Sequence, residues 1–303
     1  MKIVVSGATG LIGSALTAAL QRRDHEVVPL VRRRPAAGER AIAWDPEHGT
    51  IDRAGLEGAD VVVHLAGENV FGRWSPAKKQ RIRDSRVLGT RLVSDAIAGL
   101  ERPPQVLLAA SAIGYYGDRG DEALTEQSPP GEDFLAHVAR DWEAATAPVT
   151  RAGLRVVNMR FGVVLSTKGG ALATMLPAFR LGLGGPVGSG NQYLSWITLD
   201  DAVNAIIHVL TTGTVVGPVN VTAPAPVTNR EFARTLGKVL GRPAVVTVPA
   251  FALRMAFGTE GAAMLQSGQR VYPQRLRASG FHFACDAVEP ALRHLLAAPH
   301  SGR

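Results

Sequence analysis

One stretch near the start of the chain decides its fold, and it reads Lys2-Ile3-Val4-Val5-Ser6-Gly7-Ala8-Thr9-Gly10-Leu11-Ile12-Gly13. The apolar residues up to Ser6 predict a buried strand, and Leu11–Arg23 has the spacing of an amphipathic helix. Glycine accepts positive φ and lets a backbone approach a ligand closely. A helix N-terminus offers free N–H groups to a phosphate. We therefore predict a dinucleotide-binding turn made by Gly7, Thr9, Gly10, Leu11, Ile12 and Gly13.

The same order of strand and helix repeats through the first half of the chain. Further apolar runs occur at Glu26–Val31, Asp60–Leu65, Gln105–Ala110 and Arg155–Met159. Unbroken apolar runs are typical of parallel strands that are covered on both faces. Longer polar segments, Pro76–Leu100 and Gly131–Arg151, are predicted to be crossover helices. The fold class is therefore α/β, with a doubly wound parallel sheet. Pro29 predicts an early end or an irregular edge for its strand.

The pattern loosens after about residue 160, where glycine and proline crowd the stretch Gly182–Gly190. A helix is expected at Thr228–Leu240, because threonine and asparagine at its start are good N-cap residues. We expect a nucleotide-binding domain over residues 1–225, with substrate-lobe insertions after about residue 165. A small, mostly helical C-terminal lobe is expected over residues 226–303.

Composition excludes several classes of protein. The chain of 303 residues has 33 basic and 26 acidic side chains, a formal charge of +7, without a basic tail. We therefore predict no nucleic-acid partner. No apolar run approaches the length of a membrane span, and no signal peptide is expected. Cys285 is the single cysteine, which suits a reducing compartment, and no metal-ligand spacing occurs. We expect a soluble, cytoplasmic protein without a metal.

The residues after the second predicted strand indicate which cofactor is bound. An NAD site has an acidic residue here to hold the ribose 2′-hydroxyl. This chain instead has Val31-Arg32-Arg33-Arg34. Because a guanidinium suits a 2′-phosphate, we predict NADP(H), with Arg32 as its partner. Small residues after the third of these runs (Leu65, Ala66, Gly67) leave room for the cofactor, and His64 before them is interpreted as a core histidine.

Several separated motifs resemble a known family. GATGLIG, HLAG and SAIGYYG resemble the extended short-chain dehydrogenase/reductase superfamily. WDPEHGTID, RWSPAKKQRIRDSR and SGQRVYPQRL look like its atypical branch of NAD-dependent epimerase/dehydratase-like proteins, which are sugar-nucleotide epimerase-like and carry a C-terminal DUF1731-type domain, here from about residue 248. The resemblance implies an NAD(P)-binding Rossmann fold and a smaller C-terminal substrate lobe. It also implies that Arg86 and Arg160, the latter in RFGVVL, lie near the cofactor or substrate.

The catalytic pair of that superfamily is missing. Its enzymes use a tyrosine and a lysine four residues later on one helix, with a serine after the preceding strand. Ser111 matches the serine, which the resemblance places near both cofactor and substrate, but Phe134 and Val138 hold the other two positions. Neither can transfer a proton. Tyr115 and Tyr116 follow Ser111, and we predict Ser111 and Tyr116 as the groups that polarise a substrate.

Two functions follow from these residues. The first is an NADP(H)-dependent oxidoreductase or epimerase that acts on a small carbonyl or sugar-like substrate, including an anionic one. The second is a non-catalytic protein that binds NADPH or senses its redox state, which the loss of the tyrosine–lysine pair favours. A monomer and a homodimer are both compatible with the sequence.

Overall fold

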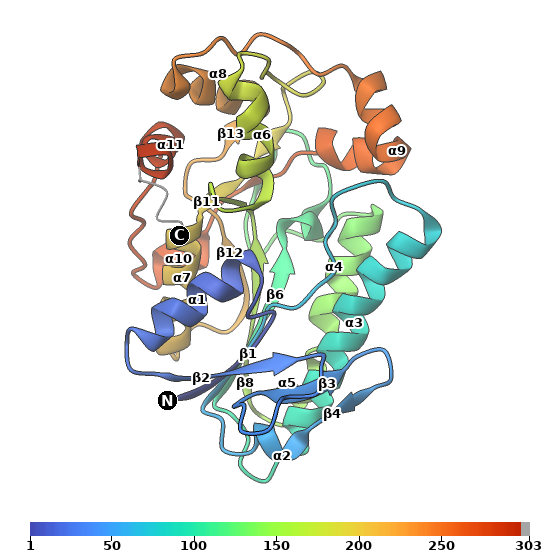
Figure 1. Cartoon of the computed structure of the whole chain (residues 1–303), viewed down its shortest axis with the longest axis vertical. Helices are drawn as coiled ribbons and strands as arrows, with labels where there is room; N and C mark the ends of the chain where they lie inside the picture. Colours follow the sequence, from blue (N-terminus) through green and yellow to red (C-terminus); the bar gives the residue numbers. More distant parts are fainter. Residues whose placement is uncertain (298–303) are drawn as a thin grey trace.

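The computed structural model describes residues 1–297, so the last six residues of the predicted C-terminal lobe lie outside the described range. Its centre is an eight-stranded sheet in which every neighbouring pair is parallel except the last, β3 with β4 (Figure 1). The strands follow in the spatial order β12 (Gly217–Val221), β8 (Arg155–Phe161), β6 (Val106–Ala112), β5 (Val61–His64), β1 (Lys2–Ser6), β2 (Glu26–Val31), β3 (Ile42–Asp45) and β4 (Thr50–Ile51). This is the predicted doubly wound Rossmann fold.

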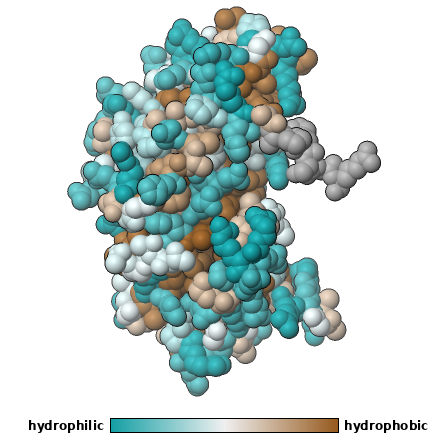
Figure 2. Space-filling view, turned by 90° about the vertical axis from the view of Figure 1, so that its left-hand side faces the viewer, coloured by the Kyte–Doolittle hydropathy of each residue, from teal (hydrophilic) through white to brown (hydrophobic). Residues whose placement is uncertain are grey.

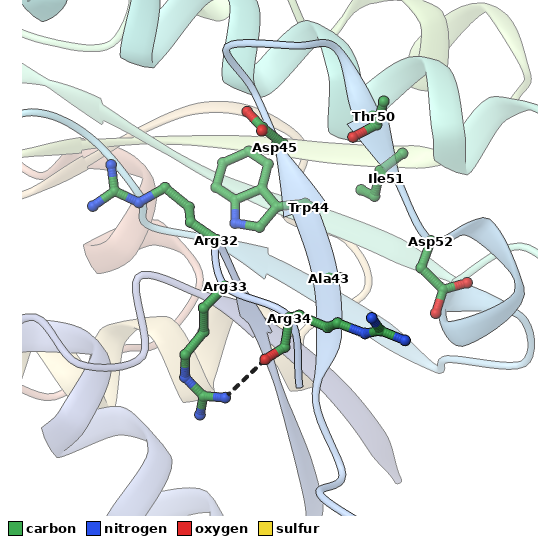
Figure 3. Close-up of a pocket in the computed structure, with 9 residues that line it drawn as sticks. All are labelled: Arg32, Arg33, Arg34, Ala43, Trp44, Asp45, Thr50, Ile51 and Asp52. Atoms are coloured by element: carbon green, nitrogen blue, oxygen red, sulfur yellow. Dashed lines mark hydrogen bonds between the residues drawn. The ribbon is translucent and has the colours of Figure 1, made fainter. Parts of the chain in front are cut away.

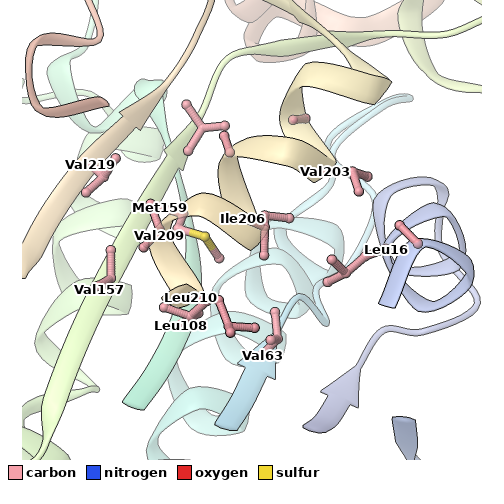
Figure 4. Close-up of a cluster of buried hydrophobic side chains, with 14 of the residues drawn as sticks. Leu16, Val63, Leu108, Val157, Met159, Val203, Ile206, Val209, Leu210 and Val219 are labelled. Carbon is pink, nitrogen blue, oxygen red and sulfur yellow. The ribbon is translucent and has the colours of Figure 1, made fainter. Parts of the chain in front are cut away.

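Helices cover both faces of the sheet. On one face α1 (Leu11–Gln21) and α7 (Leu199–Thr211) pack on the central strands, and Figure 4 shows Leu16 and Ile206 meeting Val63 there. The other face is covered by α2 (Arg53–Leu56), α3 (Pro76–Ala98) and α5 (Ala147–Arg151). Burial on both faces explains why the strands read as unbroken apolar runs.

Two sequence expectations need correction, and one pair of strands was not predicted. The strand of Pro29 runs on to Val31 inside the sheet, since its outer neighbour β3 pairs only from Leu30 onward. The segment Gly131–Arg151 is two helices, α4 (Phe134–Ala144) and α5, because Pro148 lacks the N–H that a continuous helix would use. The hairpin β3–β4 was not predicted, since strands of four and two residues carry too little periodicity.

The rest of the chain forms a smaller lobe at the upper end in Figure 1. Its helices are α6 (Gly170–Arg180), α8 (Asn229–Leu240), α9 (Ala250–Gln266) and α11 (Val288–Ala297). The short helix α10 (Gln274–Ala278) lies beside α7, and its Leu276 belongs to the core of the main sheet. Directly after β6, Ile113–Tyr116 forms a short 3₁₀ turn, η1. Thr228 caps α8 as predicted. Three short two-stranded sheets lie outside the main sheet: β9 (Val163–Leu165) with β11 (Trp196–Thr198), β10 (Tyr193–Leu194) with β13 (Val227–Thr228), and β7 (Ala123–Leu124) with β14 (Arg270–Val271).

The face shown in Figure 2 is mainly hydrophilic, with hydrophobic residues visible at its upper end and near its middle. Within residues 1–297 no helix has an apolar stretch long enough to cross a bilayer.

A buried carboxylate joins α7 to the segment that leads into α11. Asp201 is fully buried and accepts the backbone N–H groups of Ala284 at 2.9 Å and Cys285 at 3.0 Å. Its neighbour Asp200 is exposed. Charge-assisted hydrogen bonds of this kind contribute more to stability than neutral ones.

Replacing Asp201 by asparagine should lower the free energy of unfolding by about 1–3 kcal/mol, because an amide N–H would face one of the two backbone donors. Urea unfolding of the variant measures this loss. Asp200→Asn is the matched control: it removes only an exposed contact with His294 at 3.5 Å and a charge in the first turn of α7, so it should lower the unfolding midpoint much less. Equal midpoints for both variants would contradict the structural role of Asp201.

Candidate functional site

The glycine turn lies where β1, β5 and α1 approach one another closely. Gly7 has φ +67°, and a Cβ on it would lie 3.0 Å from the backbone nitrogen of Ala66. A Cβ on Gly13 would lie 2.1 Å from the carbonyl oxygen of Gly7. Neither position therefore accepts a side chain. These two glycines bring the start of α1 directly against the ends of the two central strands.

The start of α1 is open to an anion. Gly10 is its N-cap and offers no side-chain acceptor, and its first turn contains no acidic residue. The N–H groups of the first turn have no partner within a helix. Together with the close approach at Gly7 and Gly13, this end fits the pyrophosphate of a dinucleotide.

A buried serine and histidine fix the neighbouring loop. The Ser6 hydroxyl accepts the N–H groups of Leu65 and Ala66 at 3.1 and 3.2 Å, and it lies 2.7 Å from Nδ1 of His64. Burial lowers the pKa of His64 to about 4, so the ring is neutral. Its edge-to-face contact with Trp44 has a centroid distance of 5.7 Å. The interpretation of His64 as a core histidine is confirmed.

A hollow of about 270 Å³ lies beyond the end of β2 (Figure 3). Its lining residues are Arg32, Arg33, Arg34, Ala43, Trp44, Asp45, Thr50, Ile51 and Asp52. Arg33 turns away and pairs with Glu39. Arg32 and Arg34 extend to opposite sides of Trp44. Among the contacts of residues 1–297, neither of these two has an ion-pair partner, so both charges are free for an anion.

Arg32 lies on the side of the loop that follows β5. Its charge helps to lower the pKa of Glu68, after the larger contribution of the hydrogen bond from Lys78. That hydrogen bond joins Nζ of Lys78 to Glu68 at 2.7 Å. Because Glu68 follows directly on Ala66 and Gly67, Arg32 is on the same side as the glycine turn, whereas Arg34 is on the far side of Trp44.

The side chain of Arg86 donates a hydrogen bond to the loop that follows β5. Its guanidinium donates to the carbonyl oxygens of Glu68 at 3.0 Å and Ile82 at 3.1 Å, and it lies over the ring of Trp142. A Cβ on Gly67 would lie 3.5 Å from the guanidinium carbon. Burial lowers the pKa of Arg86 to about 10. Arg86 thus adds a positive charge directly beneath the predicted cofactor loop.

At the ends of β6 and β8 the polar side chains form a closed network. Arg160 and Glu143 make a two-pronged ion pair with N–O distances of 2.7 and 2.8 Å, and the hydroxyl of Ser111 donates to the same carboxylate at 2.7 Å. Ser111 and Arg160 are 2% exposed. Burial disfavours the charge of Arg160, but the hydrogen bonds with Glu143 outweigh it and hold the pKa of Arg160 above its usual range.

Tyr116 belongs to this network. Its hydroxyl donates to Oδ1 of Asn220 at 2.7 Å and accepts a hydrogen bond from Arg160 at 2.9 Å. The side chain is fully buried, and burial raises the pKa of Tyr116 to about 12. In this geometry neither Tyr116 nor Ser111 presents a free hydroxyl to a substrate. Its neighbour Tyr115 is partly exposed, and the centroid of its ring lies 3.5 Å from the guanidinium carbon of Arg160.

Helix α4 offers apolar groups where the superfamily has its pair. Phe134 packs against Trp74 with a centroid distance of 5.6 Å, and Val138 is buried. One and two turns before Glu143 on the same face stand Ala139 and Leu135. The polar residue that this helix does supply is Glu143, which the sequence analysis missed. The sequence does contain a signal for Glu143, because its carboxylate follows an apolar helix face by one turn.

The network continues into the C-terminal lobe. Asn220 donates to the carbonyl oxygen of Tyr272 at 3.0 Å, and its backbone N–H donates to Glu126 at 3.1 Å. Glu126 also accepts the N–H of Arg275 at 3.1 Å. The motif SGQRVYP is therefore held against the strand ends by buried hydrogen bonds. These contacts join residues about 50 to 150 positions apart in sequence.

Replacing Glu143 by glutamine should lower the free energy of unfolding by about 3–5 kcal/mol, because Arg160 would remain buried without a counter-charge. Thermal and urea unfolding measure this effect. The matched control is Asp95→Asn, which breaks the exposed pair between Asp95 and Arg91 and should cause no measurable loss. A Glu143→Gln protein as stable as the control would show that the ion pair does not hold the strand ends.

Two solved structures are similar to this fold over 98% of the chain. The crystal structure of human epimerase family protein SDR39U1 (isoform 2) with NADPH has a TM-score of 0.91 and 37% identity, and the match covers 98% of this chain and 99% of that chain. The nucleoside-diphosphate sugar epimerase of Corynebacterium glutamicum has a TM-score of 0.79 and 39% identity, over 98% of this chain and 58% of that one.

Sequence relatives and family models agree with these structures. Epimerase family protein Mb2239 of Mycobacterium bovis is 44% identical over 298 residues, which covers 98% of each chain. The family model of the NAD dependent epimerase/dehydratase family matches residues 3–222, and that of a domain of unknown function, DUF1731, matches residues 248–295. The chain therefore belongs to the NAD dependent epimerase/dehydratase family.

Proposed function

We propose that this protein binds NADP(H) in preference to NAD(H) and uses it to transfer hydride to or from a small substrate. The observation that carries the proposal is Arg32, an exposed guanidinium without an ion-pair partner among residues 1–297, whose charge acts on Glu68 in the loop after β5. No carboxylate stands in its place to hold a ribose 2′-hydroxyl. The human structure with NADPH, at 37% identity, supports the same cofactor.

The two phosphate groups of the proposed cofactor each have residues that fit them. The first-turn N–H groups of α1 (Leu11, Ile12 and Gly13) would hold the pyrophosphate, and Arg32 the 2′-phosphate. Leu65, Ala66 and Gly67 would wall the cleft, with the Arg86 charge beneath them. When bound, the cofactor supplies a hydride donor or acceptor. The chain contributes binding, orientation and exclusion of water, and the closed network of Ser111 and Tyr116 contributes rigidity.

A second candidate is supported by that same network. Ser111 donates to Glu143 and Tyr116 donates to Asn220, so neither of the predicted catalytic hydroxyls is free. A protein that binds NADP(H) without turnover would have this arrangement. The two functions share the cofactor site and differ only in whether a hydride leaves it.

Titration of the cofactor-free protein with NADPH and with NADH tests the shared site. NADPH should bind more tightly, and Arg32→Ala should weaken NADPH by about 10- to 100-fold, the effect of one charge-assisted hydrogen bond. NADH affinity should stay unchanged. The NADPH affinity should also fall as salt rises.

Arg34→Ala is the matched control, since Arg34 extends to the opposite side of Trp44. It should leave both affinities within about threefold of the original protein. An equal loss in the two variants would mean that the arginines attract anions only through their general charge. Equal binding of NADPH and NADH would overturn the cofactor preference.

A further inference from the structure

The end of β6 presents a methyl group, not a hydroxyl, on one face of the sheet. Ser111 and Ala112 are consecutive residues of an extended strand, with φ −141° and ψ 151° at Ala112. Consecutive side chains of a strand point to opposite faces. Ser111 faces α4 and donates to Glu143. The partly exposed residue at the strand end is therefore Ala112.

The neighbouring polar groups already donate their hydrogen bonds to partners inside the protein. The hydroxyl proton of Tyr116 is held by Asn220, and Arg160 gives its hydrogen bonds to Glu143 and Tyr116. On α4 the face that leads back from Glu143 carries Ala139 and Leu135. Each of these groups is fixed by a contact inside the protein, so none of them is a poised acid for a substrate at this edge.

This environment selects for a particular kind of hydride acceptor. An isolated ketone becomes an alkoxide on reduction, and a positioned acid accelerates that step by about 10² to 10⁴. A conjugated, electron-poor ring spreads the incoming charge over its own atoms and takes its proton later from water. We infer that the substrate of this site is such a self-activated acceptor, a quinone or a flavin, and not a simple ketone or a nucleotide sugar. This inference rests on the proposed NADP(H)-dependent function.

The reaction balances without a side-chain acid. Two electrons and one hydrogen nucleus pass as hydride from the dihydronicotinamide ring to the acceptor, so one C–H bond breaks and one bond to hydrogen forms on the acceptor. NADPH is oxidised to NADP⁺ and the quinone is reduced to its anion. Water then protonates that anion, which gives the hydroquinone.

Tyr115 carries a further hydroxyl at this edge, and its role is tested by a variant. It is partly exposed, and its ring lies over Arg160 at 3.5 Å and edge-on to Tyr116 at 5.4 Å. Tyr115→Phe keeps the ring and removes only the hydroxyl. If Tyr115 only covers the buried cation, this variant turns over as fast as the original protein.

The experiment compares menadione with tetralone, a fused-ring ketone of similar size, in protein that has first been shown to bind NADPH. Calorimetry on the NADP⁺ complex should detect binding of menadione but not of UDP-glucose. NADPH oxidation should be at least about 100-fold faster with menadione than with tetralone, the range that a missing acid accounts for. The menadione rate should not change between about pH 6 and about pH 9, and UDP-glucose should not be epimerised.

Tyr115→Phe should keep the menadione rate within about threefold, with a solvent deuterium isotope effect near one. Three results would overturn the inference: turnover of tetralone or UDP-glucose at the menadione rate, a loss above about tenfold in Tyr115→Phe, or no binding and no turnover of menadione. Failure of NADPH to bind in the first step would instead overturn the proposed function itself.

Discussion

The buried ion pair between Arg160 and Glu143 is the interaction on which the strand-end region depends. It joins β8 to α4, takes the hydroxyl of Ser111 from β6, and orients Tyr116 toward Asn220 on β12. Two charges in a protein interior are stable only when each is fully paired. Here the carboxylate accepts on both oxygens and the guanidinium donates to both partners, so the pair fixes three strands and a helix at once.

The cofactor edge has the opposite character. Arg160 is buried and paired with Glu143. Arg32, in contrast, is exposed and has no ion-pair partner among the described residues, and the start of α1 has no side-chain cap. A site that binds a charged ligand needs free donors, whereas a scaffold needs satisfied ones. Two regions at the carboxyl ends of the same sheet therefore differ in role. The glycine turn and Arg32 are open to an anion, and the hydrogen-bond network beyond β6 is a rigid scaffold. Arg86 is intermediate, since it is partly buried and its guanidinium donates to carbonyl oxygens and not to a carboxylate.

The same network links the C-terminal lobe to chemistry at the strand ends. Tyr272 and Arg275 contribute backbone groups to Asn220 and Glu126, and β14 pairs with β7. The DUF1731 region is thus part of the framework of the sheet edge and not an independent appendage. At the positions where the resemblance places a tyrosine and a lysine, this chain has Phe134 and Val138, and Glu143 further along the same helix forms a fixed salt bridge with Arg160.

The sequence alone predicted the five central parallel strands and the glycine turn, because these depend on local apolar runs and on glycines within seven consecutive positions. It also singled out Arg32 as a candidate for the 2′-phosphate, since the end of the second strand follows the turn at a fixed distance along the chain. Glu143, Asn220 and the burial of Tyr116 were decided by tertiary structure. Their partners lie 17 to 104 residues apart, and no local pattern encodes which side chains meet across such a distance. Whether a hydroxyl is a catalyst or a packed hydrogen-bond donor depends on those meetings, which is why the sequence predicted the binding site but not the state of its polar groups.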